Sequence, residues 1–171
     1  SAMEAAILAH DMLATGSHDV IVAGGMESMT NAPYLLPKAR AGYRMGHQTV
    51  ADHMFLDGLE DAYDKGRLMG TFAEDCAAAF QFTRAEQDAY ALASLSRALE
   101  AQATGAFAGE IAPVAVVGRG SETTVTADEQ PANARPEKIP ALKPALRRDG
   151  TVTAANSSSI SDGAAALVLA S

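Results

Sequence analysis

The sequence predicts a mixed α/β protein, and three observations lead to that fold class. A helical pattern over residues 1–15 ends at Gly16, and the apolar run 20–23 that follows is typical of a strand covered on both faces by helices. Residues 162–171 end in a second apolar, β-like run. Between these ends, a capping box from Thr83 to Glu86 marks the start of a further helix. A mixed α/β layer is therefore expected.

The first three segments are assigned by spacing and by turn residues. The helix over residues 1–15 has apolar residues at helical intervals, namely Met3, Ile7 and either Leu8 or Met12. Residues 30–58 contain scattered prolines and glycines, which predict an excursion of loops and short helices. From Arg67 to Phe82 the pattern predicts an amphipathic helix. We expect its apolar face to be buried, with Met69, Phe72, Ala73, Cys76, Ala77 and Phe80 on it.

The third helix is predicted from the capping box to about residue 104. In such a box, the Thr83 hydroxyl accepts a hydrogen bond from the backbone N–H of Glu86, and the Glu86 carboxylate accepts one from the N–H of Thr83. Gly105 permits a left-handed exit. A buried stripe should continue along this helix through Leu92, Leu95 and Leu99.

Two β-branched stretches and a proline-rich segment follow this helix. Residues 110–117 and 123–126 predict a small antiparallel pair of strands. Residues 127–144 contain four prolines, which exclude a central strand or a long helix. That segment is expected to cross the surface.

Composition and charge exclude several classes of function. The 171 residues are 48% apolar and 20% charged, which is ordinary for one globular domain. With 13 basic and 21 acidic residues the net charge is −8, which opposes general affinity for nucleic acid or an anionic membrane. No stretch approaches the roughly 20 apolar residues of a membrane-spanning helix. Polar residues interrupt the first twelve positions, so we expect no signal peptide there. A single cysteine favours a soluble protein from a reducing, cytoplasmic compartment.

The residues offer little independent sign of catalytic or metal chemistry. None of the four histidines has a second histidine or a cysteine at ligand spacing, so no metal site is predicted. Cys76 falls on the predicted apolar stripe, where a thiol behaves as a small hydrophobe. The pair Gly24-Gly25 lacks the third glycine of a dinucleotide fingerprint. By turn preference alone, residues 156–159 are a polar turn with solvated hydroxyls.

Four motifs, however, resemble those of one family. They are VAGGMESM at 22–29, DGLEDA at 57–62, MGTFAE at 69–74 and GTVTAANSSSISDGAA at 150–165. In this order and spacing they resemble the thiolase family, the acetyl-CoA acetyltransferases and 3-ketoacyl-CoA thiolases, from the first residue to the last.

The resemblance implies part of a thiolase-like fold, which has two α/β/α halves and an inserted α+β loop domain. Residues 1–29 would end the N-terminal half, residues 30–149 would form the loop domain covering coenzyme A, and residues 150–171 would start the C-terminal half. Both ends of the chain look cut. Ser1 resembles the serine that follows the family's nucleophilic cysteine, which is expected just upstream. The activating histidine and a second cysteine are expected beyond Ser171, so no catalytic residue is expected in this chain.

The resemblance also implies residues that bind coenzyme A. Leu59 and Met69 would pack against the pantetheine arm, although both are equally compatible with plain core packing. Ser158 would offer its hydroxyl to the pantetheine amides, and the same slot would be lined by Ala145, Leu146 and Ala154.

Two departures from the family pattern put the preferred acyl chain in doubt. Many acetyl-specific members have histidine where this chain has Leu68, and phenylalanine where it has Leu146. For the anionic end of coenzyme A the nearby cations are Arg135, Lys138 and Lys143. Each of these is more simply explained as a solvated surface charge.

The function implied is that of an acyl-CoA C-acyltransferase, which makes or cleaves 3-ketoacyl-CoA through an acyl-cysteine. Coenzyme A and acetyl-CoA would be substrates, with no permanently bound cofactor. Residues 31–53 resemble the arm through which bacterial thiolases form tetramers, so a homo-oligomer, a dimer or a tetramer, is expected. This chain would supply coenzyme A binding but not the nucleophile, and by itself it should be inactive. The alternative is a truncated, non-catalytic protein that binds coenzyme A or acts as a scaffold.

Overall fold

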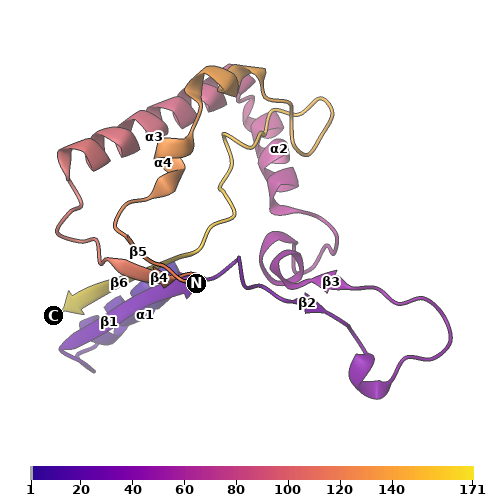
Figure 1. Ribbon diagram of the computed structural model, residues 1–171, viewed down its shortest axis with the longest axis horizontal. Helices are drawn as coiled ribbons and strands as arrows, with labels where there is room; N and C mark the ends of the chain where they lie inside the picture. Colours follow the sequence, from indigo (N-terminus) through magenta and orange to yellow (C-terminus); the bar gives the residue numbers. More distant parts are fainter. Residues whose placement is uncertain (1) are drawn as a thin grey trace. The chain divides into compact units, whose positions relative to one another are not determined.

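The computed structural model describes residues 2–171 (Figure 1), which divide into two compact units. The first unit comprises Ser1–Met69 and Ser159–Ser171, and the second comprises Gly70–Ser158. Ser1, which the resemblance matches to the serine after the nucleophile, lies outside the described residues.

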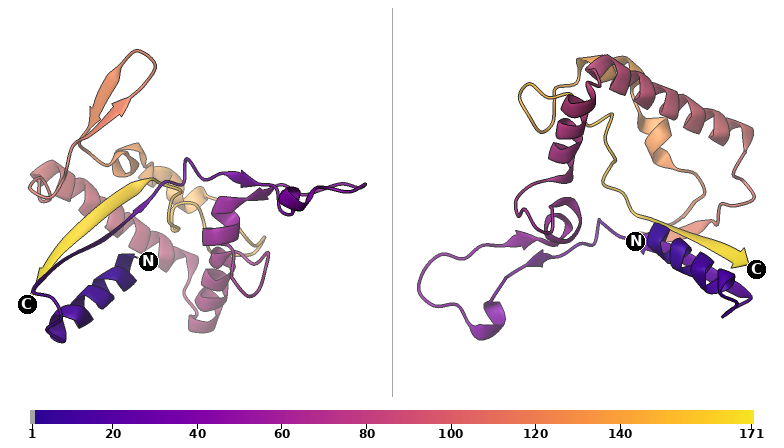
Figure 2. Two further views of the ribbon diagram at one scale, coloured as in Figure 1. Left: turned by 90° about the horizontal axis from the view of Figure 1, so that it is seen from below. Right: turned by 180° about the vertical axis from the view of Figure 1, so that it is seen from behind.

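The first unit is built on a helix and an antiparallel pair of strands. Helix α1 spans Ala2–Ala14, and strand β1 spans Val20–Glu27. Strand β6, Gly163–Ala170, pairs with β1 along its whole length, with Val20 opposite Ala170 and Glu27 opposite Gly163. Figure 2 shows α1 lying beside this pair. The structure therefore joins in one sheet the two terminal segments that the sequence analysis divided between separate halves. Each apolar run supplies the hydrogen-bonding partner that the other needs.

Helix α1 packs on the sheet through small residues. Ala9 and Ala23 are buried, and a Cβ placed on Gly25 would meet the side chain of Ala2. The larger apolar residues of α1 are exposed instead, with Met3 at 79% and Ile7 at 49%. Among the described residues of the first unit, α1 is the helix that packs on the pair, so this unit does not itself supply the expected helix cover on both faces of β1. Small side chains at the contact allow α1 and the sheet to approach closely, and the large apolar side chains of α1 therefore point outward.

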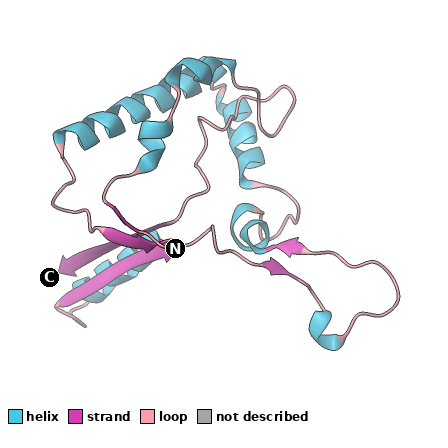
Figure 3. Ribbon diagram, in the orientation of Figure 1, coloured by secondary structure: helices cyan, strands magenta, loops and turns pink. Residues whose placement is uncertain are grey.

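The rest of the first unit consists of short elements, as the sequence predicted for residues 30–58. Strands β2, Tyr34–Leu35, and β3, Ala51–Asp52, pair antiparallel on either side of a 3-10 turn. A π-helix, Phe55–Leu59, follows directly (Figure 3). Elsewhere in the unit, Asp162 Oδ1 accepts a hydrogen bond of 2.9 Å from the N–H of Thr30, which ties the end of β1 to the start of β6. Hydrogen bonds from Thr30 are the largest reason that the pKa of Asp162 is lowered.

Two helices dominate the second unit. Helix α2, Met69–Phe80, begins at the boundary between the units, and α3 spans Arg84–Thr104. The predicted capping box is confirmed. The N–H of Glu86 donates to the Thr83 hydroxyl at 3.2 Å, and the N–H of Thr83 donates to the Glu86 carboxylate at 2.8 Å. Gly105 ends the helix with a φ of 67°, as predicted.

The segment after α3 also follows the sequence prediction. Strands β4, Val114–Val117, and β5, Glu122–Val125, form an antiparallel hairpin, which projects away from α3 in the left view of Figure 2. Helix α4, Glu129–Asn133, is five residues long, and a 3-10 helix covers Pro136–Ala141. Residues 127–144 thus contain only short helices, which agrees with the prediction that they form neither a long helix nor a central strand.

The buried face of α2 differs from the predicted apolar stripe. Glu74 and Ala77 are the buried residues of this helix, whereas Cys76 is exposed and Phe80 is 70% exposed. The prediction for Cys76 as a buried residue is therefore wrong. The hydrogen bonds that Glu74 makes allow the face that carries this carboxylate to be buried in place of the purely apolar face. On α3, Leu92 and Leu95 of the predicted stripe are half-buried and Leu99 is exposed, and the buried residue of this helix is Asp88.

Candidate functional site

Residues 150–158, the first part of the motif that the resemblance links to coenzyme A, lie in a folded-back segment of the second unit. The N–H of Ala145 donates to the carbonyl of Val152 at 2.9 Å, and the N–H of Gly150 donates to the carbonyl of Arg147 at 3.1 Å. These two bonds close residues 145–152 into a tight loop. Residues 153–158 continue from it as irregular chain.

The buried carboxylate of Glu74 holds this loop against α2. Its two oxygens accept hydrogen bonds from the N–H of Thr151, at 2.9 and 3.1 Å, and from the N–H of Val152, at 3.0 Å. The Thr151 hydroxyl adds a bond of 3.3 Å. Gly150 lies so close to the carboxylate that a Cβ there would collide with it. Glu74 is 4% exposed, so these donors replace water as its hydrogen-bond partners.

A second carboxylate holds the same segment from α3. Asp88 accepts a hydrogen bond of 2.7 Å from Arg84 Nε and a weaker one of 3.4 Å from Asn156 Nδ2. Asn156 Nδ2 also donates to the carbonyl of Thr151 at 3.1 Å, and its Oδ1 accepts from the N–H of Thr153 at 2.7 Å. Thr153 is fully buried. Residues 151–156 are thus fixed from both helices, so Asn156 is a structural anchor and not merely part of a solvated turn.

A pocket of about 710 Å³ lies between α3 and the end of this segment. One wall comes from the first half of α3 and from Phe82, two residues before it, and the other wall comes from residues 155–158. The lining residues are Phe82, Glu86, Gln87, Tyr90, Ala91, Ser94, Ala155, Asn156, Ser157 and Ser158. The walls combine aromatic rings with hydroxyl and amide groups, which is the composition of many small-molecule sites.

The six predicted coenzyme A residues lie at different places. Ser158 is exposed and lines the pocket, and none of the other five belongs to its lining. Leu146 packs against Gly70 at the start of α2, while Ala145 and Ala154 are exposed on the anchored segment. In the first unit, Leu59 ends the π-helix, half-buried, and Met69 is 43% exposed. Their role in binding coenzyme A stays a prediction.

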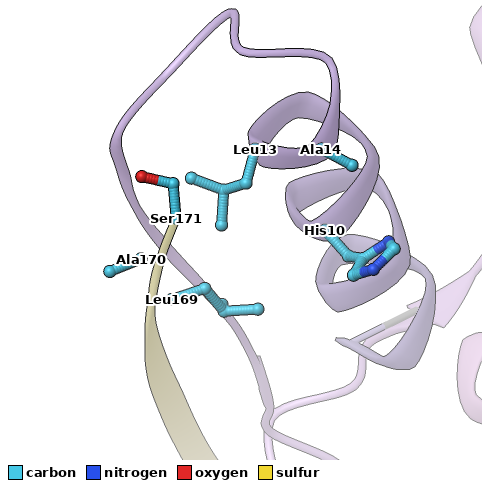
Figure 4. A pocket seen from close by; sticks show the side chains of 6 residues that line it. All are labelled: His10, Leu13, Ala14, Leu169, Ala170 and Ser171. Carbon is cyan, nitrogen blue, oxygen red and sulfur yellow. The ribbon is translucent and has the colours of Figure 1, made fainter.

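A second pocket, of about 480 Å³, lies in the first unit at the end of α1 (Figure 4). Leucine and alanine side chains supply most of its lining, together with His10 and Ser171. His10 is exposed, and its Nδ1 lies 3.2 Å from Oδ1 of Asp11, the next residue on the same helix. Because no predicted site residue and no buried polar group lines this pocket, it is the weaker candidate.

The ionisation of Glu74 makes the anchor dependent on pH. Desolvation raises the pKa of Glu74, but the N–H groups of Thr151 and Val152, the Thr151 hydroxyl and the charge of Arg147 together outweigh it. The net pKa lies below the ordinary value of 4.5.

The sign of this shift gives a testable result. A carboxyl group whose pKa is lower in the folded state adds stability above its unfolded pKa of 4.5, and that stability is lost as the pH falls through the folded pKa. We therefore expect the difference in unfolding free energy between the native protein and Glu74→Gln to be largest near neutral pH and to shrink below pH 4.5. Urea titrations between about pH 3 and pH 7 measure this difference. A difference that stays constant over this range would contradict the assignment.

Sequence reasoning missed the anchoring roles of Glu74 and Asp88. Glu74 was part of a recognised motif, but its role was not assigned. The available signal was its spacing from small residues, since Gly70, Glu74 and Ala77 follow at i, i+4 and i+7 on one helix face. A carboxylate between small residues on a face that packs closely against backbone is well placed to accept N–H bonds.

Within residues 2–171, no group of three or more histidine, cysteine, aspartate or glutamate side chains is arranged to hold a metal ion. In that same part of the chain, every helix is too short or too polar to cross a membrane.

Comparison with known proteins identifies the family. The chain matches the family described as "Thiolase, N-terminal domain" over residues 1–171. It is 49% identical to an acetyl-CoA acetyltransferase of Schizosaccharomyces pombe, over 100% of this chain and 44% of that protein. It is 50% identical to acetyl-CoA acetyltransferase 1 of Arabidopsis thaliana, over 99% of this chain and 41% of that protein. The chain thus spans less than half the length of these relatives.

Solved structures agree with this assignment. An acetyl-CoA acetyltransferase from Syntrophomonas wolfei superposes with a TM-score of 0.88 and 41% identity, covering 98% of this chain and 42% of that one. The Acat5 thiolase from Ascaris suum, solved in complex with coenzyme A, gives a TM-score of 0.89 and 42% identity, covering 100% of this chain and 43% of that one. The mixed α/β elements are those of a partial thiolase-like fold. The chain belongs to the thiolase family and corresponds to its N-terminal domain region.

Proposed function

We propose that this chain is the part of an acyl-CoA C-acyltransferase that binds and covers coenzyme A, in an enzyme that makes or cleaves 3-ketoacyl-CoA. The observation that carries the proposal is the doubly anchored segment 151–158. The buried carboxylate of Glu74 holds its backbone, the buried carboxylate of Asp88 holds the side chain of Asn156, and its end leaves the Ser158 hydroxyl exposed at a pocket. Similarity to a thiolase solved with coenzyme A supports the choice of ligand.

In this proposal the chain binds and orients the substrate, and the covalent chemistry belongs to groups outside it. Thioester exchange needs a thiolate nucleophile, a base that moves a proton, and donors that stabilise an oxyanion. Cys76, the only cysteine, is exposed on α2 and has no histidine within the same unit, because all four histidines lie in the first unit. The nucleophile is therefore assigned elsewhere.

A titration with coenzyme A tests the binding role. A serine hydroxyl can both donate to and accept from the pantetheine amides, and each such bond contributes about 0.5–1.5 kcal/mol. We expect Ser158→Ala to raise the Kd for coenzyme A by about 3- to 10-fold in isothermal titration calorimetry. Ser96→Ala, at an exposed serine of α3 outside the pocket lining, is the matched control and should leave the Kd unchanged.

The possible outcomes test the binding role and the place of the nucleophile. Absence of saturable binding by the native protein would overturn the proposal, and equal Kd values for the native protein and Ser158→Ala would remove Ser158 from the site. Thiolysis of acetoacetyl-CoA by the 171-residue chain alone should be nil under either candidate. Turnover abolished by Cys76→Ser would instead place the nucleophile on α2.

The arm at residues 31–53 is proposed to join copies of the protein. It presents apolar side chains to solvent, with Tyr34 at 70% and Met45 fully exposed. Exposed apolar surface of this kind favours association. We expect multi-angle light scattering to give a mass of at least a dimer, and replacing Tyr34 and Met45 with serine to lower that mass. A native protein that is monomeric at micromolar concentration would refute the proposed role of the arm.

A further inference from the structure

Glu74 is the buried acidic residue of α2, and its partners are unusual for a helix carboxylate. Three of its four hydrogen bonds come from two consecutive backbone N–H groups, those of Thr151 and Val152. Thr151 and Val152 lie 77 and 78 positions after Glu74 in the sequence, so this one side chain joins two distant segments of the chain. The positive charge of Arg147 also lowers the pKa of Glu74, and Arg147 itself pairs with Asp75 at 2.5 Å on the surface side of α2.

The carboxylate fixes a conformation and not merely a contact. Two successive N–H groups can point at one carboxylate only for a narrow range of backbone angles at the residues that carry them. Gly150 contributes, because any larger residue there would place a Cβ inside the carboxylate. The backbone direction at residues 150–152 therefore depends on Glu74 being present and ionised.

The fixed segment leads directly to the proposed binding residues. Val152 and Thr153 are buried, and Asn156 is bonded to both Thr151 and Thr153. The orientation set at residues 151 and 152 is thus passed through a bonded turn that contains Ala154 and ends at Asn156, and Ser158 follows two residues later; Ala154 and Ser158 are exposed. Glu74 itself does not line the pocket.

We propose that Glu74 is a positioning residue for coenzyme A, which acts by holding residues 151–158 in the conformation that binds the pantetheine arm. This inference rests on the proposed function of the same segment. Without the carboxylate, the segment samples other conformations, and the apparent Kd rises by the inverse of the fraction that remains competent.

Glu74→Gln tests this directly. The glutamine keeps the shape but has one acceptor oxygen, and its NH₂ group would face backbone donors. We expect the Kd for coenzyme A to rise by about tenfold, corresponding to a competent fraction of about one tenth. Amide hydrogen exchange of Thr151 and Val152 should accelerate. Glu100→Gln, the same change at an exposed glutamate of α3, is the matched control and should alter neither quantity.

A double-mutant cycle separates positioning from a general loss of stability. If Glu74 acts through Ser158, the effect of Glu74→Gln on the Kd should be clearly smaller in a Ser158→Ala background than in the native one. A fully additive effect would overturn the inference. So would a Glu74→Gln protein with faster exchange at residues 151 and 152 but an unchanged Kd.

Two further results keep the test decisive. If Glu74→Gln does not fold, Glu74→Asp is measured in its place. This variant keeps the charge but is one methylene shorter, and we expect it also to raise the Kd for coenzyme A. If the native protein fails to bind coenzyme A, the proposed function itself is refuted. Native binding with a Kd unaffected by either variant refutes only the role of Glu74.

Discussion

Gly24→Ala is expected to destabilise the β1–β6 sheet by about 3 kcal/mol, the upper end of the usual cost of overpacking. A Cβ at Gly24 would collide with the backbone carbonyl oxygen of Ala165 and lie 2.9 Å from the Cα of Ala166 on the neighbouring strand. Backbone atoms of a paired strand cannot move aside as a flexible side chain can. The strands would therefore have to separate locally or shift their register.

The measurement should be local, because the chain divides into two compact units and need not unfold in one step. Amide hydrogen exchange of Val22 and Val168, a pair in the β1–β6 register, reports the opening of this sheet. Gly163→Ala is the control, since a Cβ there has no atom within 4 Å. It should leave exchange unchanged or slow it slightly, because it reduces the freedom of the unfolded chain. Equal effects of the two substitutions would refute the packing argument.

Asp88→Ala is expected to lower the unfolding free energy of the second unit by about 2–3 kcal/mol. Its side chain is 9% exposed and bonds Arg84 and Asn156, so its removal takes the closest acceptor from the Arg84 guanidinium and one of two acceptors from the Asn156 amide. Loss of one member of a fully buried pair costs roughly 3–5 kcal/mol. The smaller figure follows because Arg84 is 24% exposed and keeps a bond to the Ile139 carbonyl.

Urea unfolding followed by circular dichroism, with amide exchange along α3, measures this change. Glu100→Ala removes an acidic side chain from the exposed side of the same helix and should have little effect. Because Asp88 also holds Asn156, exchange at residues 151–156 should accelerate in Asp88→Ala and not in Glu100→Ala. A stable Asp88→Ala protein with unaltered exchange there would show that the Asp88 bonds do not anchor the segment.

Local sequence signals predicted the elements that depend on neighbouring residues. The capping box at Thr83 and the left-handed Gly105 set the limits of α3 without help from distant parts of the chain. The hairpin of β4 and β5 follows from β-branched stretches close together in sequence. The family, too, was recognised from motifs in the sequence, and the comparisons confirm it.

The candidate site was only partly predictable, for a different reason. Ser158 was selected through its motif, and the structure places it at a pocket, but the residues that hold its segment were not identified. The predicted buried faces of α2 and α3 were defined by apolar residues alone, whereas Glu74 and Asp88 are buried carboxylates. The N–H group of Val152 lies 78 residues from Glu74, and the Asn156 amide lies 68 residues from Asp88, so periodicity carries no information about these donors.

By itself, the sequence determined the helices, the turns, the hairpin and the family, because each of these depends on short-range propensity or on motifs of contiguous residues. The tertiary structure alone decided which face of each helix is buried, that β1 pairs with β6, and that Glu74 holds the backbone of Thr151 and Val152. These features depend on groups distant in sequence. Hydrogen bonds and close packing between such groups outweigh the preference of large apolar side chains for burial, as exposed Met3 and buried Glu74 illustrate.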